Sequence, residues 1–279
     1  MDLVTIYIPT HNRPLLLDRA LTSCFSQTYS DIEIIVSDDG SSSETRELIS
    51  AKMKQDSRIK YIRSDKPLGA CNARNLAIQA ARGKYITGLD DDDEFVHHRV
   101  ESLVSSYSKN LSFVCSNFII KNNFSGSETA VYKKRKDIIF APRDILFKNI
   151  ASNQVLTETS KLRSIDGFNV RLRKFQDWDT WLRLSHAYGD FLRLKTPSYI
   201  MHDDSENRVS NNLKHKDALS MLFAENSSLY SAEDKKIMRF LINNRAIAEK
   251  IKTIAAESIK FKSWYLIKHY IGSLNKYYI

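Results

Sequence analysis

The sequence predicts an α/β fold with a mostly parallel central sheet, flanking helices and a helical C-terminal extension. Within residues 1–120, short runs rich in β-branched residues alternate with segments whose apolar residues recur at helical spacing. This alternation is typical of parallel strands joined by helical crossovers. From about residue 217 onward only the helical pattern remains, so the extension follows the part of the chain that forms the sheet.

Four strands and three helices are expected in the first 90 residues. We expect the strands at Val4–Ile8, Ile32–Ser37, Arg58–Arg63 and Tyr85–Leu89. A helix should follow the first strand, because Leu17, Leu21 and Cys24 share one helical face. Another helix is expected over Gly69–Ala81.

Two helix ends are expected from local signals. Ser41 and Glu44 have the spacing of a capping box for a helix after the second strand. Gly83 stands where a left-handed residue would end the helix before the fourth strand.

Beyond the fourth strand the expected elements are a helix, a strand and a polar segment. The helix should cover about Phe95–Tyr107 and the strand about Leu111–Ile120, and Lys121–Lys136 should be a hairpin or a mobile loop. The stretch Ile145–Phe191 contains a second group of polar residues, and Ile247, Ile251 and Ile254 share a helical face in the extension.

Length and composition describe an ordinary globular protein. Of its 279 residues 42% are hydrophobic and 27% are charged, which argues against a disordered or coiled-coil chain. No run approaches the roughly 18 to 20 apolar residues of a membrane span, and Met1–Pro9 becomes polar too soon for a signal peptide. The three cysteines have no paired spacing and are expected to be small buried side chains in a cytoplasmic protein.

The net charge of +9 is concentrated near the C-terminus. From Asn211 to the end the chain has twelve Lys or Arg residues against six Asp or Glu. A basic balance of this kind favours nucleic acid, an anionic membrane or an anionic ligand as partner.

An unbroken run of five acids, Asp90 to Glu94, follows the fourth strand. Mutual repulsion makes such a run costly unless solvent or a cation compensates it. An Asp-x-Asp at the end of a buried strand can hold Mg²⁺ or Mn²⁺ and leave positions open for phosphate. A calcium EF-hand is disfavoured, because Phe95 stands where that loop needs glycine.

The loops after the first two strands lack the glycine-rich motifs of the common nucleotide-binding sites. Neither GxGxxG nor GxxxxGK[ST] occurs, so a Rossmann dinucleotide site and a P-loop are unsupported. Asp38 ends the second strand, where its carboxylate could accept a hydrogen bond from an imide such as uracil. The alternative is that Asp38 is a turn residue in Asp-Asp-Gly-Ser, and from that residue alone the turn is favoured.

Several ordered motifs together resemble the inverting glycosyltransferase family 2, which has the GT-A fold. The resemblance covers roughly residues 3–210. The motifs are Ile6–Arg13, Gln27–Tyr29, Ile34–Ser41, Ala73–Asn75 and Gly83–Asp93. It implies a catalytic domain at 1–210, with a nucleotide-binding half at about 1–120 and an acceptor half at about 121–210, and a basic helical extension at 211–279.

The resemblance also implies the residues of the donor site. The nucleotide-sugar site would consist of Pro9, Thr10, Asn12, Arg13, Asp38, Asp39, Arg74, Asp90 and Asp91. Thr10 and Asp38 match the positions that hold the uracil of a UDP-sugar, and Arg74 matches the basic residue near the diphosphate. Asp90 and Asp92 match the DXD motif that binds Mn²⁺ or Mg²⁺, and His202 matches a position that sometimes completes this metal site.

A later motif implies the catalytic base. Gly167-Phe168 followed by Gln176-Asp177-Trp178-Asp179 resembles the family's Gly-Phe and Glu-Asp pattern, in which the Asp is the base. Asp177 takes that position, while Gln176 replaces the usual Glu. Asp179 is a nearby competitor that helical spacing directs elsewhere. Trp178 could pack in the core or form a platform for the acceptor.

The expected activity is a metal-dependent inverting transfer from a nucleotide-sugar, a UDP-sugar by preference, to a hydroxyl of a saccharide acceptor. A lipid-linked oligosaccharide used for surface polysaccharide is the preferred acceptor, and no nucleic-acid partner is expected. A sugar-1-phosphate nucleotidyltransferase is the first alternative, but Pro9–Pro14 contains none of the glycines that such an enzyme needs after its first strand. A non-catalytic membrane or nucleic-acid module is the second, and it leaves the acids unexplained.

The tail from Arg245 to Ile279 allows two interpretations. Its lysines alternate with aromatic and aliphatic residues in a partly amphipathic pattern. The tail could pack on the catalytic domain, or it could attach the protein to the anionic inner face of the plasma membrane.

Overall fold

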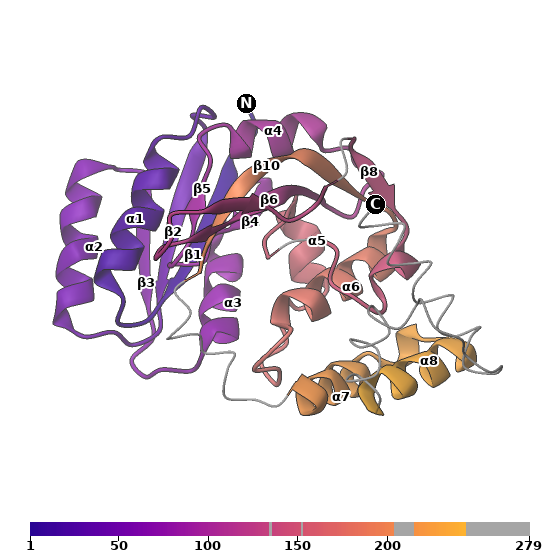
Figure 1. Ribbon diagram of the computed structural model, residues 1–279. Helices are drawn as coiled ribbons and strands as arrows, with labels where there is room; N and C mark the ends of the chain where they lie inside the picture. The colour runs from indigo at the N-terminus through magenta and orange to yellow at the C-terminus, as the bar shows by residue number, and fades with distance from the viewer. Residues whose placement is uncertain (134–135, 152, 204–214, 244–279) are drawn as a thin grey trace.

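The structure is a computed structural model, and it describes residues 1–133, 136–151, 153–203 and 215–243 (Figure 1). The residues of the tail that carry its expected apolar face, Ile247, Ile251 and Ile254, lie outside the described residues.

A mixed sheet in the order β3-β2-β1-β4-β9-β6-β10-β5 forms the centre of the fold, with β7 added to β6 and β8 to β10. Its strands are β1 Val4–Thr10, β2 Ile32–Asp38, β3 Ile59–Arg63, β4 Tyr85–Gly88, β5 Glu94–Phe95, β6 Val114–Asn122, β7 Glu128–Ala130, β8 Ile138–Phe140, β9 Leu156–Glu158 and β10 Phe191–Asp203. The pairs β1/β2, β2/β3 and β1/β4 are parallel, as the alternating pattern predicts. The strands β6 and β10 are also parallel, and β10 is not among the strands expected from the sequence. The short strand β9 is antiparallel to both β4 and β6 and joins the two halves of the sheet.

Helices cover both faces of the sheet, because neighbouring residues of its strands point to opposite sides. Ile6 and Ile34 pack with α1 Pro14–Phe25, α2 Ser43–Gln55 and α4 Arg99–Ser106. Tyr7 and Ile35 pack with α3 Ala70–Ala80, α5 Thr159–Ser164 and α6 Gln176–Tyr188. In Figure 1 α1 and α2 lie to the left of the sheet, and α3, α5 and α6 lie on its other side.

The C-terminal helices complete the second of these layers. α7 His215–Glu225 and α8 Ala232–Asn243 place Leu222 and Met238 in the same apolar cluster as Trp181 of α6. The helical pattern expected after residue 217 is therefore confirmed as far as Asn243, and this part packs against α6 in the second layer.

Two expected helix ends are wrong. The helix α2 starts at Ser43 without a side-chain cap, because the Ser41 hydroxyl accepts the Asn12 N–H instead. Gly83 does not adopt a left-handed conformation. A Cβ on Gly83 would lie 2.5 Å from the backbone nitrogen of Thr5, so close packing against β1 explains the glycine.

The region after the acidic run also differs from expectation. The helix expected from Phe95 begins only at Arg99, because Glu94–Phe95 pairs with β10 as β5. The hairpin expected within Lys121–Lys136 is confirmed, with β7 antiparallel to β6.

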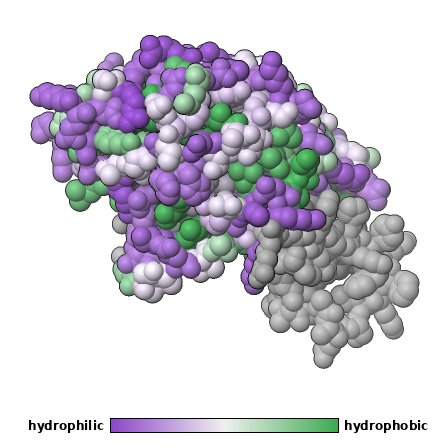
Figure 2. Space-filling model, turned by 90° about the horizontal axis from the view of Figure 1, so that it is seen from above, coloured by the Kyte–Doolittle hydropathy of each residue, from purple (hydrophilic) through white to green (hydrophobic). Residues whose placement is uncertain are grey.

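Figure 2 shows the molecule from above the view of Figure 1. Hydrophilic side chains dominate the end at which α1 and α2 lie, and the larger apolar patches lie nearer the middle of this face. No helix among the described residues is both long and apolar enough to cross a membrane.

Candidate active site

The expected donor residues gather at the carboxyl edge of the parallel strands. Pro9 and Thr10 of β1 lie beside Ser37 and Asp38 of β2, and the acidic run leaves the adjacent strand β4 at the same edge. This edge is where ligands bind in open parallel sheets.

Asp90 is the centre of a polar network that links three elements. Its Oδ1 accepts hydrogen bonds from Arg74 Nη2 of α3 (2.9 Å) and from Gln154 Nε2 (3.1 Å). Arg74 donates a further bond of 2.8 Å to Gln176 Oε1, at the start of α6. The guanidinium is largely shielded, and its central carbon lies 5.1 Å from the centre of the Phe168 ring. Arg74 therefore connects the acidic run to the helix that carries Asp177.

Asp91 and Asp92 share the guanidinium of Arg13. Arg13 Nη1 lies 3.1 Å from Asp91 Oδ1 and 3.1 Å from Asp92 Oδ2. The hydroxyl of Thr10 donates to Asp91 Oδ2 over 2.8 Å, so Thr10 supports the acidic run from β1. Burial, opposed by the charge of Arg13, raises the pKa of Asp91 to about 6. The Asp92 side chain is 40% exposed and is the more accessible of the two carboxylates.

Asp93 and His202 form a separate group behind the run. Asp93 accepts hydrogen bonds from the Tyr199 hydroxyl (2.7 Å) and from the His202 backbone N–H (3.0 Å). Burial and the neighbouring Asp92 and Asp90 raise the pKa of Asp93 well above its ordinary value. The His202 ring lies 2.6 Å from Glu94 Oε1 through Nε2 and 2.8 Å from Asn123 Oδ1 through Nδ1. Both ring nitrogens thus have contacts within the protein, and a metal would have to displace one of them.

The carboxylates of Asp38 and Asp39 accept hydrogen bonds from groups of the protein itself. Asp38 has a fully buried carboxylate that accepts the Ser41 N–H (2.8 Å) and the Tyr61 hydroxyl (2.6 Å). The carboxylate of Asp39 accepts the backbone N–H groups of Leu68 and Gly69, both at 2.7 Å.

Asn12 joins the first loop to the second, since its N–H donates to the Ser41 hydroxyl and its Oδ1 accepts the Ser42 N–H.

Asp177 lies in the first turn of α6 and is partly buried. Its Oδ2 accepts a hydrogen bond of 2.7 Å from Asn149 Nδ2. Burial raises the pKa of Asp177 to about 6, against the backbone N–H of Trp178, and the charge of Asp90 raises it further. A carboxylate of this pKa is ionised at neutral pH and can accept a proton from a reacting hydroxyl.

The neighbours of Asp177 on α6 have packing roles. The carboxylate of Asp179 is fully buried and is bound by Arg183 and by Asn226. Trp178 is 5% exposed and donates its indole N–H to the Ile145 carbonyl over 2.7 Å. Trp178 is therefore a core residue, which is the first of the two alternatives that the sequence left open.

Sequence reasoning missed several residues that support the site. Gln154, Asn149 and Tyr199 contact Asp90, Asp177 and Asp93 from positions 64, 28 and 106 residues away. Gln154 and Asn149 stand in no motif, so only the fold brings them to the acidic side chains.

Two carboxylates of the run could share a divalent cation with a ligand. Among the described residues, no group of three or more His, Cys, Asp or Glu side chains is arranged to hold a metal ion. Mg²⁺ and Mn²⁺ sites, however, often use one or two carboxylates and complete the shell with phosphate oxygens and water. Asp90, bound by the protein at Oδ1, and the exposed Asp92 fit such a shared site.

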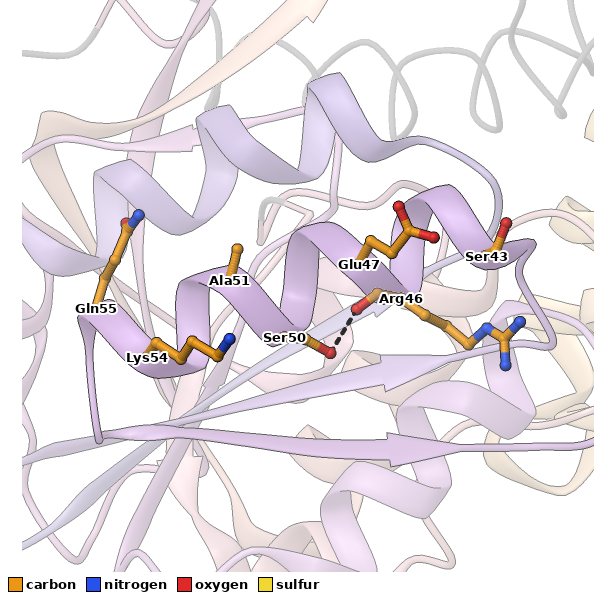
Figure 3. A pocket seen from close by; sticks show the side chains of 7 residues that line it. All are labelled: Ser43, Arg46, Glu47, Ser50, Ala51, Lys54 and Gln55. Atoms are coloured by element: carbon orange, nitrogen blue, oxygen red, sulfur yellow. Dashed lines mark hydrogen bonds between the residues drawn. The ribbon is translucent and has the colours of Figure 1, made fainter.

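A hollow elsewhere on the surface lies apart from this constellation. It runs along the outer face of α2, between Ser43 and Gln55 (Figure 3). Its side chains come from successive turns of one helix and carry charges of both signs, and the Ser50 hydroxyl donates to the Arg46 carbonyl of the same helix. Nothing in this hollow resembles the convergence of polar groups at the carboxyl edge of the sheet.

Comparison with known proteins identifies the family. The family described as "Glycosyl transferase family 2" matches residues 5–169, which is more than half of the chain. The chain belongs to glycosyltransferase family 2. The match includes β1, the acidic run and Gly167. The expected glycosyltransferase activity and family are thus confirmed, and both alternative functions lose their support.

Relatives of this glycosyltransferase include three bacterial proteins whose names describe polysaccharide or glycan synthesis. An Escherichia coli K12 protein named for colanic acid biosynthesis, WcaA, is 31% identical over 249 residues, which cover 86% of this chain and 87% of the relative. The Escherichia coli UDP-Glc:alpha-D-GlcNAc-diphosphoundecaprenol beta-1,3-glucosyltransferase WfaP is 33% identical over 66% of this chain and 70% of its own length. A Campylobacter jejuni GalNAc(5)-diNAcBac-PP-undecaprenol beta-1,3-glucosyltransferase is 34% identical over 43% of this chain, and the match spans 40% of that relative.

Solved structures confirm the GT-A fold of the glycosyltransferase. Residues 1–349 of S. aureus TarS in complex with UDP-GlcNAc align with a TM-score of 0.68 at 16% identity, covering 99% of this chain and 80% of that chain. The mannosyltransferase PcManGT of Pyrobaculum calidifontis, in complex with GDP-Man and Mn²⁺, aligns with a TM-score of 0.64 at 14% identity and covers 98% of this chain and 79% of its own.

Proposed function

We propose that this glycosyltransferase transfers a sugar, with inversion, from a UDP-sugar to a hydroxyl of a saccharide acceptor. The observation that carries the proposal is the arrangement around Arg74, whose guanidinium bonds to both Asp90 and Gln176. Arg74 thereby links Asp90, a carboxylate suited to share a divalent cation with the donor diphosphate, to the helix turn that carries Asp177. Asp177 is a carboxylate suited to accept a proton. Donor and acceptor would meet between the two carboxylates.

On the donor side, the nucleotide would bind across the first two loops. We assign this role to Pro9, Thr10, Asn12, Arg13, Asp38, Asp39, Arg74, Asp90 and Asp91. Arg13 and Arg74 provide positive charge for the diphosphate, which requires Arg13 to exchange one carboxylate contact for a phosphate. Asp38 and Asp39 would act by fixing the loops around the nucleobase, since their oxygens already accept hydrogen bonds from backbone N–H groups.

The proposed cofactor is Mn²⁺ or Mg²⁺, held by Asp90 and Asp92 together with the diphosphate. When bound, the ion would offset the charge that develops on the departing diphosphate. His202 remains a proposed ligand that would have to give up Glu94 or Asn123.

On the acceptor side, Asp177 would accept the proton of the attacking hydroxyl. That oxygen attacks the anomeric carbon while the bond to the diphosphate breaks on the opposite face, so one displacement inverts the centre. The pKa of about 6 leaves Asp177 ionised at pH 7 and able to act as this base.

The acceptor is proposed to be a lipid-linked oligosaccharide used in surface polysaccharide synthesis. The names of the Escherichia coli and Campylobacter jejuni glucosyltransferases, which contain undecaprenol-linked acceptors, support this assignment. The basic tail after residue 244 supports a peripheral attachment to the membrane that carries such an acceptor.

The test combines binding with product analysis. We expect UDP to raise the melting temperature in the presence of Mn²⁺, and to raise it much less in EDTA or in Asp92→Ala. A panel of nucleotide-sugars should then identify a donor, and NMR of the product should show the inverted anomer. The same shift in EDTA, with full Mn²⁺-independent activity of Asp92→Ala, would refute the metal assignment. A product with the donor's own anomeric configuration would refute the single displacement.

A further inference from the structure

One connecting segment contacts both Asp90 and Asp177, the carboxylates that have roles in the proposed function. Residues 149–151 and 153–155 precede β9, and two amide side chains of this segment reach the carboxylates. Asn149 Nδ2 donates to Asp177 Oδ2 over 2.7 Å, and Gln154 Nε2 donates to Asp90 Oδ1 over 3.1 Å. We propose that Asn149 and Gln154 are positioning residues, and that their segment sets the base Asp177 against the donor-side carboxylate Asp90. The inference rests on the function proposed above.

The orientation of each amide follows from its two hydrogen bonds. An ionised carboxylate only accepts hydrogen bonds, so Gln154 turns its NH₂ group to Asp90, and its Oε1 accepts the hydroxyl of Tyr7 over 2.8 Å. Asn149 Oδ1 accepts the backbone N–H of Ala151 over 3.0 Å, so its NH₂ group must face Asp177. Each amide therefore offers a donor to an ionised carboxylate, and its reversal would place the amide oxygen against that carboxylate.

The arrangement leaves one oxygen of Asp90 available. Arg74 and Gln154 both donate to Oδ1, and no donor among the described residues reaches Oδ2. Gly88 provides the space for Gln154, because a Cβ at Gly88 would lie 2.2 Å from Gln154 Oε1. Gln154 and Arg74 thus hold the carboxylate by one oxygen and leave the other without a donor among the described residues.

Two buried arginines hold the backbone of the same segment. Arg99 Nη2 donates to the Gln154 carbonyl over 3.0 Å, and Arg193 Nη1 donates to the Ile150 carbonyl over 2.8 Å. Arg99 is 0% and Arg193 is 3% exposed, and neither has a carboxylate partner among the described residues. A buried cation without an anion is costly, and aromatic rings offset only part of that cost. That two such cations bind this short segment supports its role as a fixed support.

Neither amide substitution adds or removes a charge among the charged and titratable groups around Asp177. These groups are Arg74 of α3 and Asp90 after β4, with Tyr7, Cys71 and Tyr132 as further neighbours. Loss of the Asn149 donor removes a bond that stabilises the ionised carboxylate, so protonation of Asp177 becomes easier. Loss of Gln154 changes the support of Asp90 and leaves that of Asp177 intact.

The two variants should therefore fail in different measurements. Asn149→Ala should lower kcat about tenfold and move the acid limb of the pH profile of kcat to higher pH, with unchanged affinity for UDP and Mn²⁺. Gln154→Met should weaken the binding of UDP with Mn²⁺, measured by calorimetry, by about tenfold, the lower end of the range for outer-shell support of a metal site, and leave the acid limb in place. Asn153→Ala, an amide of the same segment without a hydrogen bond to either carboxylate, is the matched control and should resemble the wild type.

Melting temperatures identify any variant that fails to fold, and in that case Asn149→Ser or Gln154→Leu is tested in its place. The proposal would be overturned if Asn149→Ala and Gln154→Met changed the same one of these quantities, either the acid limb of kcat or the affinity for UDP with Mn²⁺. It would also be overturned if Asn153→Ala lost as much as they do. Failure of the proposed function itself is recognised separately, since the wild type would then neither bind UDP nor transfer a sugar.

Discussion

Asp177 and Asp179 lie two positions apart on α6, yet their surroundings give them different roles. Within the part of the chain that the structure describes, Asp177 has one side-chain donor, the neutral Asn149, and remains partly exposed. Asp179 is fully buried, with Arg183 on one oxygen and Asn226 on the other. A base must have an oxygen that can reach the acceptor, and only Asp177 fulfils this condition.

The first prediction concerns the base. Asp177→Asn keeps the shape of the side chain and removes its ability to accept a proton, so kcat should fall by roughly 10²-fold or more. The affinity for UDP with Mn²⁺ should change little, because Asp177 is assigned to the acceptor. Steady-state kinetics and calorimetry on one preparation check both statements. A large loss of UDP affinity with kcat preserved would contradict the assignment.

The second prediction concerns pH. Burial raises the pKa of Asp177 to about 6, so the carboxylate is protonated and inactive as a base below that pH. Since the ionised form is the active one, kcat should be level above about pH 7 and fall roughly tenfold per pH unit well below pH 6. Initial rates between pH 4.5 and 8, with stability checked at each pH, provide the measurement. A kcat that stayed level down to pH 4.5 would exclude Asp177 as the titrating base.

At the scale of elements, α6 is held between the sheet and the C-terminal helices. Arg183 donates to Asp179 and also to the carbonyls of Ile165 and Gly167, in the loop after α5. Asn226, just after α7, donates to the other oxygen of Asp179 over 2.7 Å. The buried carboxylate thus joins three segments that are distant in sequence and keeps the first turn of α6 in place.

The third prediction follows from this anchor. Asp179→Ala leaves the Arg183 guanidinium without its counter-charge and Asn226 without its acceptor, so the free energy of unfolding should decrease by about 3 kcal/mol or more. Urea denaturation followed by circular dichroism measures the change. Asp177→Asn, on the same helix, is the control and should be close to the wild type. Equal stability of Asp179→Ala would mean that the anchor contributes little.

The strands and most helices of the first half could be predicted because they follow strong local patterns. Val4–Thr10 and Ile32–Asp38 are apolar runs bounded by polar turns, and α3 has regular helical spacing. The expected capping box at Ser41 failed because Asn12, 29 residues earlier in the chain, binds the Ser41 hydroxyl. Phe95 became part of a strand because β10, a distant segment, pairs with it. Tertiary contacts of this kind leave no local signal.

The candidate site divides in the same way. Asp90, Arg74 and Asp177 stand in motifs and were named from the sequence, and the fold connects them through the contacts of Arg74. Gln154 and Asn149 belong to a connection without regular structure, and their role depends on hydrogen bonds to residues 64 and 28 positions away. Only a folded chain brings these amides to their carboxylates.

At the scale of the whole molecule, charge is distributed unevenly. The acids at the carboxyl edge are paired with Arg13 and Arg74, whereas residues 211–279 contain twelve of the basic residues against six acids. An excess of positive charge that is not needed to balance the active site is available for an anionic partner. For an enzyme whose proposed acceptor is anchored in a membrane, the negatively charged leaflet is the partner that this charge best suits.

The last prediction tests this partner with the full-length chain. Reversal of Lys260, Lys262 and Lys268 to Glu should abolish sedimentation with vesicles that contain anionic lipid, because each basic residue near the surface contributes about 1 kcal/mol. The wild type should sediment at low salt and be released at high salt, since exposed charges are screened. Reversal of Lys54, Lys60 and Lys109, which are exposed on the described surface, is the charge-matched control and should still sediment. Equal loss of sedimentation in both triple variants would show a response to net charge alone. If neither the wild type nor the control sedimented with the vesicles, the membrane would be removed from the proposed function, and the proposed transfer reaction would be unaffected.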